Sequence, residues 1–477
     1  MSKIIQSKMI VICFILLFGM FCSLLIGIES NSKIEGMWRG GIEIQGEDIP
    51  DIVFQIFKNA DGVLRSMLES PDQTFRVVVD SIMFKDNDIR LILKSMNGTF
   101  EGKLKTDDMI IEGQWQQGEQ TFPLTLKHID NIPERIKPQD PKRPYPYIEE
   151  EVIYENKKAG IKLVGILSYP AANGYYPAVL LIDGSGLGDR NDIATGQRSF
   201  QVLADHLTRQ GIAVLTVDKR GVWRSTGDFS QATTEDFAHD VFAGIEYLKN
   251  RRDINSKQIG LVGLSEGAMI AAMIAAQSSD VAFLVEMAGP GKGLDEIMVE
   301  QKCLNAKAEG ASDENISILR NWYKHFYTVA KTENDDVVIE KKIRDKYEKM
   351  TEPEKEILGW SERKLSDEMR RVLSPWWRYL LNYDPQSFLM NVKCPVLAIN
   401  GSKDQQVVAK ENLKGIEEAL KSGGNKQITI LELEGLNHNF QNAETGAESE
   451  YAKIAERMAP SAMDTISVWV KRQIDSD

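Results

Sequence analysis

The amino-acid sequence predicts an α/β fold with a mostly parallel sheet and helices on both faces, preceded by a small all-β barrel or sandwich. Three observations support this prediction. Short runs that alternate apolar and polar residues fill 34–130, prolines crowd into 131–148, and apolar runs alternate with helical stretches over 149–477. At 477 residues the chain is long enough for two domains and a targeting segment.

The first thirty residues differ from the rest of the chain. Lys3 and Lys8 precede an apolar run from Met9 to Ile28, and polar residues follow it. A basic start, an apolar centre and a polar exit are typical of a secretory signal. The run is also long enough to span a bilayer. We therefore expect export to the periplasm, the cell envelope or the outside of the cell. Residues 1–30 are either a cleaved signal peptide or a membrane anchor.

The all-β prediction for 34–130 depends on alternation. Val53–Phe57, Ile89–Leu93 and Met109–Trp115 are short runs of this kind, with Gly, Asp and Asn between them. Short strands at regular spacing indicate an antiparallel sandwich or barrel. The linker prediction for 131–148 depends on five of the sixteen prolines, which restrict φ and remove hydrogen-bond donors. We expect a semi-rigid connection there.

The α/β prediction for 149–477 depends on apolar runs that suit parallel strands buried on both faces. These runs are 177–182, 212–217, 259–262, 283–287 and 395–400, with helical stretches such as 200–210, 236–251 and 266–277 between them. A charged, tryptophan-containing segment at 291–382 interrupts the alternation with a helical period. It is either a lid over an active site or a solvated helical hairpin.

The segment Gly263-Leu264-Ser265-Glu266-Gly267 predicts a nucleophilic serine. An apolar strand ends just before this segment, and a helix rich in Ala and Met begins inside it. In that context the G-x-S-x-G pattern indicates a cramped strand-to-helix turn that exposes the Ser265 hydroxyl. The start of the helix also presents backbone N–H groups to developing negative charge.

A serine needs a base, and the base needs an acid to orient it. Of the five histidines, only His438 lies in a loop directly after a predicted strand, 428–433. Asp404 follows the strand at 395–400. Sites of open parallel sheets gather at the carboxyl ends of strands. We therefore predict a triad of Ser265, Asp404 and His438, in that chain order.

Tetrahedral chemistry also requires hydrogen-bond donors for an oxyanion. The glycine-rich loop that begins at Asp183 follows the strand at 177–182. We predict that the backbone N–H groups of Glu266 and Ser185 form the oxyanion hole. The later segment that begins Asp218-Lys219-Arg220-Gly221 is expected to be structural, with Asp218 and Arg220 bonding neighbouring loops.

Charge and composition exclude several other functions. A net charge of −13 argues against nucleic acid as a partner, because an acidic chain repels phosphate backbones. The glycine-rich loop is not followed by Gly-Lys-Ser/Thr, so it does not indicate a nucleotide site. The chain contains no CxxC motif or Cys/His cluster that would hold a metal. We expect no cofactor, and membrane attachment only through the N-terminal segment.

These motifs resemble a known family. Gly184-Ser-Gly, Asp218-Lys-Arg-Gly-Val, Gly263-Leu-Ser-Glu-Gly and Gly435-Leu-Asn-His are similar to segments of bacterial α/β-hydrolases of the serine aminopeptidase-like and carboxylesterase groups. The segment Gly36-Met-Trp-Arg-Gly resembles the β domain of two-domain bacterial carboxylesterases. The resemblance implies the α/β-hydrolase fold, the triad named above and activity on short acyl esters.

The chain departs from the family pattern at two places. Asp183 stands before Gly-Ser-Gly, where many relatives carry His or a small polar residue. Trp223-Arg224 replaces a small, flexible pair. A carboxylate beside the oxyanion loop would disfavour an anionic intermediate. Two alternatives to a serine esterase stay open. They are a peptidase or aminoacyl hydrolase with the same triad, and an envelope binding protein whose hydrolase domain is vestigial. Oligomeric state is also left open.

Overall fold

The computed structural model describes residues 33–41, 43–44, 47–48, 51–70, 75–131, 137–171, 174–190, 198–451 and 453–475. They form two compact units. The first comprises described residues of 33–58, 63–131 and 360–374, and the second comprises those of 59–62, 137–359 and 375–475. The predicted targeting segment 1–30 lies outside the described residues. Within the described ranges, no helix has the length and apolar character needed to cross a membrane.

The first unit is built on a nine-stranded antiparallel sheet with the order β6-β5-β4-β1-β11-β10-β9-β8-β7. Its strands are β1 (Gly36–Gly40), β4 (Ile52–Lys58), β5 (Leu64–Ser70), β6 (Phe75–Val78), β7 (Ser81–Lys85), β8 (Asp88–Leu93), β9 (Gly98–Lys105), β10 (Ile110–Gln117) and β11 (Gln120–Ile129). A separate pair consists of β2 (Glu43–Ile44) and β3 (Glu47–Asp48).

This sheet curls towards closure. The Val79 N–H donates to Ser66 O, next to one edge strand, and the Asp80 N–H donates to Ile92 O, next to the other. The chain thus crosses directly between the two ends of the sheet. Trp38, Phe54 and Phe100 belong to the buried core. The barrel-like form of the predicted β domain is therefore the one observed.

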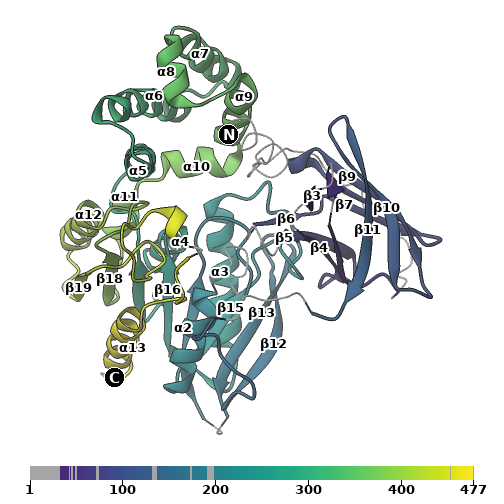
Figure 1. The fold of residues 1–477 in the computed structure, drawn as a ribbon. Helices are drawn as coiled ribbons and strands as arrows, with labels where there is room; N and C mark the ends of the chain where they lie inside the picture. The colour runs from purple at the N-terminus through teal and green to yellow at the C-terminus, as the bar shows by residue number, and fades with distance from the viewer. Residues whose placement is uncertain are drawn as a thin grey trace. The chain divides into compact units, whose positions relative to one another are not determined.

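The second unit contains an eight-stranded sheet with the order β12-β13-β15-β14-β16-β17-β18-β19 (Figure 1). The strands are β12 (Tyr147–Asn156), β13 (Ile161–Pro170), β14 (Tyr176–Ile182), β15 (Ala213–Val217), β16 (Ile254–Leu264), β17 (Phe283–Met287), β18 (Val396–Gly401) and β19 (Ile428–Leu433). β13 pairs antiparallel with both β12 and β15, and all other pairs are parallel.

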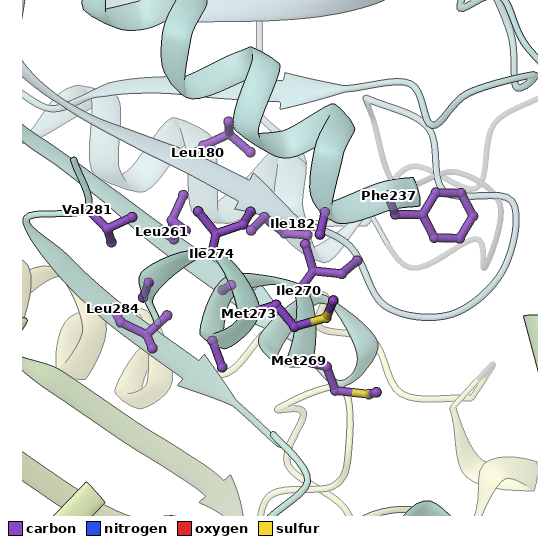
Figure 2. Packing of buried hydrophobic residues seen from close by; sticks show 14 of the residues in the cluster. Leu180, Ile182, Phe237, Leu261, Met269, Ile270, Met273, Ile274, Val281 and Leu284 are labelled. Carbon is purple, nitrogen blue, oxygen red and sulfur yellow. The ribbon is translucent and has the colours of Figure 1, made fainter. Parts of the chain in front are cut away.

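Helices cover both faces of this sheet. On one face pack α3 (Thr234–Lys249), α4 (Glu266–Ala275), α11 (Pro385–Leu389) and α12 (Ala409–Ser422), and on the other pack α2 (Ser199–Arg209) and α13 (Pro460–Ile474). All ten residues of α4 are buried. Figure 2 shows Met269, Ile270 and Ile274 of α4 among buried side chains of the sheet. The helix that begins after Ser265 is thus held firmly, and the predicted fold class is confirmed.

The segment predicted as a helical insertion is helical. Between β17 and β18 it contains α5 (Leu294–Ala308), α6 (Asp313–Thr332), α7 (Asp336–Glu348), α8 (Glu352–Leu358), α9 (Glu362–Val372) and α10 (Pro375–Asn382). Trp322 and Tyr347 pack edge to face inside it, and Trp377 stacks on Tyr327. The aromatic residues of the insertion therefore form a core of their own.

The end of the proline-rich segment is fastened to the second unit. Lys137 Nζ donates to Ile454 O at 2.7 Å, and Gln139 Nε2 donates to Met458 O at 2.7 Å. Asp140 and Arg457 form a buried ion pair, with Arg457 Nε 2.6 Å from Asp140 Oδ1. Side-chain bonds, in addition to proline stiffness, fix this part of the predicted linker.

Candidate active site

Ser265 lies at a strained turn between β16 and α4. Its φ of +56° and ψ of −116° place a non-glycine residue in a region that L residues rarely adopt. The Ser265 N–H donates to Met287 O in the neighbouring strand β17 at 2.8 Å. This geometry is that of the sharp turn which G-x-S-x-G predicts.

Both glycines of the motif are required by close approach. A Cβ atom on Gly263 would lie 2.1 Å from Gly267 O, and one on Gly267 would lie 2.0 Å from Ile182 O. Any side chain at either position would collide with backbone. The sequence therefore dictates the turn locally, through residues that let strand and helix pack at this distance.

His438 and Asp404 are brought together by loops after β19 and β18. His438 Nδ1 lies 2.8 Å from Asp404 Oδ2, and both residues are buried, at 6% and 4% exposure. Asp404 Oδ1 accepts the N–H groups of Gln406 and Val407 at 2.8 and 2.9 Å. Hydrogen bonds of this kind stabilise the ionised carboxylate. The contact also fixes the imidazole ring, leaving Nε2 as its second functional nitrogen.

The histidine loop is stiffened by a buried amide pair. The Asn437 side-chain oxygen accepts the N–H groups of Asn439 and Gln441, and Asn437 Nδ2 donates to Gln441 Oε1. Neither Asn437 nor Gln441 is exposed. A Cβ on Gly401 would lie 2.2 Å from Leu436 O, so the loop packs directly on the end of β18. The position of His438 is therefore set by backbone packing on both sides.

The predicted oxyanion loop lies against the serine. A Cβ on Gly184 would lie 3.3 Å from Leu264 O and 3.5 Å from Ser265 Cβ. Asp183 Oδ1 accepts the Gly184 N–H at 2.7 Å, so this carboxylate folds back on its own loop. Burial raises the pKa of Asp183, and the Lys219 ammonium opposes that rise. The Glu266 N–H, at the first position of α4, is without an acceptor inside the helix.

The segment after β15 binds neighbouring elements, as the sequence predicts. Asp218 Oδ1 accepts the backbone N–H of Arg190 at 3.0 Å, and burial raises the pKa of Asp218 to about 7. Arg220 forms two bonds to Asp240 of α3, at 2.6 and 2.8 Å. The unusual Trp223 donates its indole N–H to Asp189 at 3.0 Å. The family departure at Trp223 is thus accommodated by a specific bond.

Sequence reasoning missed the role of the Glu266 side chain. Its Oε1 atom accepts hydrogen bonds from Thr234 Oγ1 of α3 and from Trp376 Nε1 of α10, both at 2.7 Å. The carboxylate is buried, and its Oε2 atom has no hydrogen-bond partner among the described residues. The insertion is therefore tied to the residue that follows the candidate nucleophile. The motif gave its position, but only the fold shows what it bonds.

A cavity of about 570 Å³ lies between α5, α6, α12 and the loop after Asp404. Its wall includes Gln406 and Val408 of that loop, together with charged residues of both signs, among them Lys292, Lys324 and Glu411. Across the described ranges, no group of three or more His, Cys, Asp or Glu residues is arranged to hold a metal ion.

The structure places all the predicted residues at one edge of the sheet. Ser265, Asp404 and His438 follow the parallel strands β16, β18 and β19, and the loop containing Ser185 follows β14. Asp404 and His438 are in direct contact. Within the described part of the chain, no hydrogen bond joins Ser265 to His438.

Comparison with known proteins gives a family and an esterase relative. The model of the family described as X-Pro dipeptidyl-peptidase (S15 family) matches residues 138–432. Esterase EstD of Thermotoga maritima is 26% identical over 326 residues, which are 68% of this chain and 69% of that protein. These findings support a serine hydrolase that acts on esters or peptides. With the observed sheet they confirm the predicted resemblance to α/β-hydrolases.

Solved structures of esterases are similar to this chain at low identity. Esterase Pf2001 of Pyrococcus furiosus is 16% identical, with 72% of this chain and 97% of that chain covered and a TM-score of 0.41. Est1E of Butyrivibrio proteoclasticus, solved with ferulic acid bound, is 17% identical, with coverages of 68% and 99% and a TM-score of 0.41.

Proposed function

Because the chain belongs to the X-Pro dipeptidyl-peptidase (S15) family, we propose that it is a serine hydrolase that cleaves short acyl esters through Ser265, His438 and Asp404. The observation that carries the proposal is the buried bond from His438 Nδ1 to Asp404 Oδ2, 2.8 Å long. It lies at the same sheet edge as the strained turn at Ser265. A small-molecule ester is the proposed substrate.

In the proposed reaction, Ser265 Oγ attacks the ester carbonyl carbon while His438 Nε2 takes the hydroxyl proton. The carbonyl oxygen becomes an oxyanion, which the N–H groups of Glu266 and Ser185 stabilise. Collapse of this intermediate breaks the bond to the alcohol, and His438 returns the proton to the leaving oxygen. Asp404 orients His438 and stabilises its charged form. Water then hydrolyses the acyl-enzyme by the same steps.

Labelling with a fluorophosphonate probe tests this proposal. We expect the wild-type chain to be labelled, and Ser265→Ala and His438→Ala to lose labelling, because the probe needs an activated serine. His239→Ala is the matched control, since His239 is a half-buried histidine of the same unit that lies in α3 and whose Nε2 is 2.7 Å from Lys158 Nζ. Labelling of Ser265→Ala at the wild-type rate would exclude Ser265 as the nucleophile.

A peptidase or aminoacyl hydrolase with the same residues is the second candidate. The observation that favours it is the family itself, whose description is X-Pro dipeptidyl-peptidase. Parallel assays on p-nitrophenyl acetate, p-nitrophenyl butyrate and an Ala-Pro p-nitroanilide separate the two. We expect kcat/KM for the acetate ester to exceed that for the anilide. The reverse order would favour the peptidase.

We also propose that the chain is exported, on the basis of the basic and apolar segment within residues 1–30. Fractionation of cells that produce the full chain tests this. Enrichment in the envelope, the periplasm or the medium is expected, and release of soluble chain without detergent would distinguish a cleaved signal from an anchor. Accumulation in the cytoplasm alone would contradict export.

A further inference from the structure

Lys219, in the segment after β15, forms hydrogen bonds to the loop after β14. Its Nζ atom donates to the carbonyl oxygen of Gly184, and it also donates to Gly186 O at 3.1 Å. The Lys219 backbone N–H donates to Gly188 O at 3.2 Å. One residue therefore bonds three carbonyl groups of a glycine-rich loop, whose conformation would otherwise be weakly restrained.

The Lys219 side chain is itself well held. Its Nζ atom lies 5.3 Å from the ring centroid of Phe237, a residue of α3. Its two neighbours in the chain, Asp218 and Arg220, are buried and bonded to other elements. The backbone on both sides of Lys219 is therefore held in place, so the ammonium group can restrain the position of the loop.

The carbonyl of Gly184 and the N–H of Ser185 belong to one peptide group. A trans peptide is planar, and its C=O and N–H point in opposite directions. When Lys219 fixes the Gly184 oxygen, it also fixes the direction of the Ser185 N–H. The neighbouring N–H, that of Gly184, is already bonded to Asp183 Oδ1 at 2.7 Å. Because Gly184 packs on Ser265, this peptide lies at the nucleophile.

We propose that Lys219 is a positioning residue of the oxyanion hole, which aims the Ser185 N–H by holding the carbonyl of Gly184. The ammonium group also polarises this peptide and makes its N–H a stronger donor. The inference rests on the proposed function, because an oxyanion arises only if Ser265 attacks a carbonyl. It assigns a mechanistic task to a side chain that the sequence placed in a structural segment.

The test compares Lys219→Met with Lys393→Met. The Lys219→Met change keeps most of the aliphatic stem and removes the ammonium. Lys393 is the matched control, since its Nζ also donates to two backbone carbonyls, of Met390 and Gly423, away from the site. The measured quantities are kcat and KM for p-nitrophenyl acetate, the Ki of a trifluoromethyl ketone, and the thermal midpoint of unfolding.

For Lys219→Met we expect kcat to fall by about 10²-fold, the loss typical of one oxyanion donor, with KM within about threefold of wild type. The ketone forms a tetrahedral oxyanion on the serine, so its Ki should rise in parallel with the loss of kcat. A purely structural role would lower the midpoint without this parallel. Lys393→Met should keep kcat and Ki within about twofold.

If Lys219→Met does not fold, Lys219→Gln serves as the second variant, with an uncharged and shorter donor and an expected tenfold or greater loss of kcat, since charged hydrogen bonds are about twice as strong as neutral ones. A kcat within threefold of wild type in the variant that folds would overturn the inference. So would a loss of kcat with an unchanged ketone Ki. A wild-type chain that neither turns over the ester nor reacts with the fluorophosphonate would instead defeat the proposed function.

Discussion

The neighbouring strands β17 and β18 of the eight-stranded sheet have buried carboxyl groups at or just beyond their carboxyl ends, and the surroundings of these two groups are opposite. Asp404 follows β18 and is 4% exposed, and its oxygens accept two backbone N–H groups and contact His438. Glu286 lies in β17 and is 2% exposed. No hydrogen bond or ion pair in the described part of the chain reaches the Glu286 side chain, and burial raises its pKa to about 8.

The difference shows that burial alone does not decide whether a carboxyl group has hydrogen-bond partners. Desolvation favours the neutral form of a carboxyl group, while hydrogen bonds to the charged form oppose it. Asp404 lies in a turn whose own N–H groups are free to bond its side chain. Glu286 lies in a strand paired on both sides, by β16 and β18, so the backbone around it is already engaged. Local backbone therefore decides which buried carboxyl group receives hydrogen bonds.

The comparison is tested most severely by Asp404→Asn. We expect kcat for p-nitrophenyl acetate to fall by about 10⁴-fold, because the amide favours the wrong histidine tautomer and cannot stabilise its charged form. Asp228→Asn is the control, since Asp228 also accepts the N–H of its own turn, from Ser230 at 2.8 Å, without a histidine. Retention of more than a tenth of wild-type kcat in Asp404→Asn would remove Asp404 from the mechanism.

Glu286→Gln tests the other half of the comparison through stability. The ordinary pKa of a glutamate is 4.5, and in the folded chain that of Glu286 is raised to about 8. Between these values the unfolded state loses the proton first, so wild-type stability falls as pH rises and levels off above pH 8. The full penalty is about 5 kcal/mol at 1.36 kcal/mol per pKa unit. Glutamine removes it.

Urea unfolding at pH 5 and pH 8.5 provides the measurement. The free energy of unfolding of Glu286→Gln, relative to wild type, should be several kcal/mol higher at pH 8.5 than at pH 5. Asp218, whose pKa burial raises to about 7, gives the wild type a pH dependence of the same sign. The difference between the two chains cancels that contribution. A difference that is equal at both pH values would show that Glu286 is ionised in the fold.

The sequence was sufficient to predict what depends on chain order. The sequence predicts Ser265, Asp404 and His438 because each follows an apolar strand, and parallel strands bring their carboxyl ends to one edge. The tight turn is predictable from Gly263 and Gly267, because the close approach of strand and helix excludes every other residue at these positions. The helical character of the insertion is predictable from the helical spacing of its apolar residues. These are local signals, or signals that any parallel sheet would combine in the same way.

What the sequence could not give depends on which strands are neighbours. Lys219 reaches Gly184 because β15 lies beside β14, a pairing that alternation of apolar and polar residues does not specify. The partnerless state of Glu286 likewise depends on β17 being flanked on both sides. The antiparallel hairpin of β12 and β13 went unrecognised for the same reason, and the periodicity of 34–130 fitted a sandwich as well as a barrel.

Glu266 is intermediate between Asp404, which has several hydrogen bonds, and Glu286, whose side chain has none in the described part of the chain. The Trp376→Phe change measures how far the turn at Glu266 depends on its bond to the insertion. Its carboxylate is partnered by side chains of α3 and α10 rather than by its own backbone. Removal of the Trp376 indole donor should lower the free energy of unfolding by about 1–3 kcal/mol, the cost of leaving a buried acceptor without one of its donors. Fluorophosphonate labelling should slow by a few-fold, because the turn loses one restraint.

Trp469→Phe is the control for this change. The Trp469 indole also donates to a side-chain oxygen, that of Thr429 at 3.1 Å, but this oxygen belongs to β19 rather than to the residue that follows Ser265. It should lose stability without a change in labelling rate. Equal effects of Trp376→Phe and Trp469→Phe on the labelling rate would mean that the bond between Trp376 and Glu266 does not influence the reactivity of Ser265.

The smallest effect is expected at Asp183, the carboxylate that the sequence placed beside the oxyanion. Its Oδ1 atom is turned onto the Gly184 N–H, and the Lys219 ammonium opposes the rise that burial causes in its pKa. Asparagine can still accept the same N–H. In the wild type the Lys219 ammonium already offsets the effect that a negative charge on Asp183 would have on the oxyanion. Removal of that charge should therefore keep kcat of Asp183→Asn within about threefold of wild type. An increase of tenfold or more would mean that Asp183 repels the oxyanion, and that its charge, unlike that of Asp404, works against the reaction.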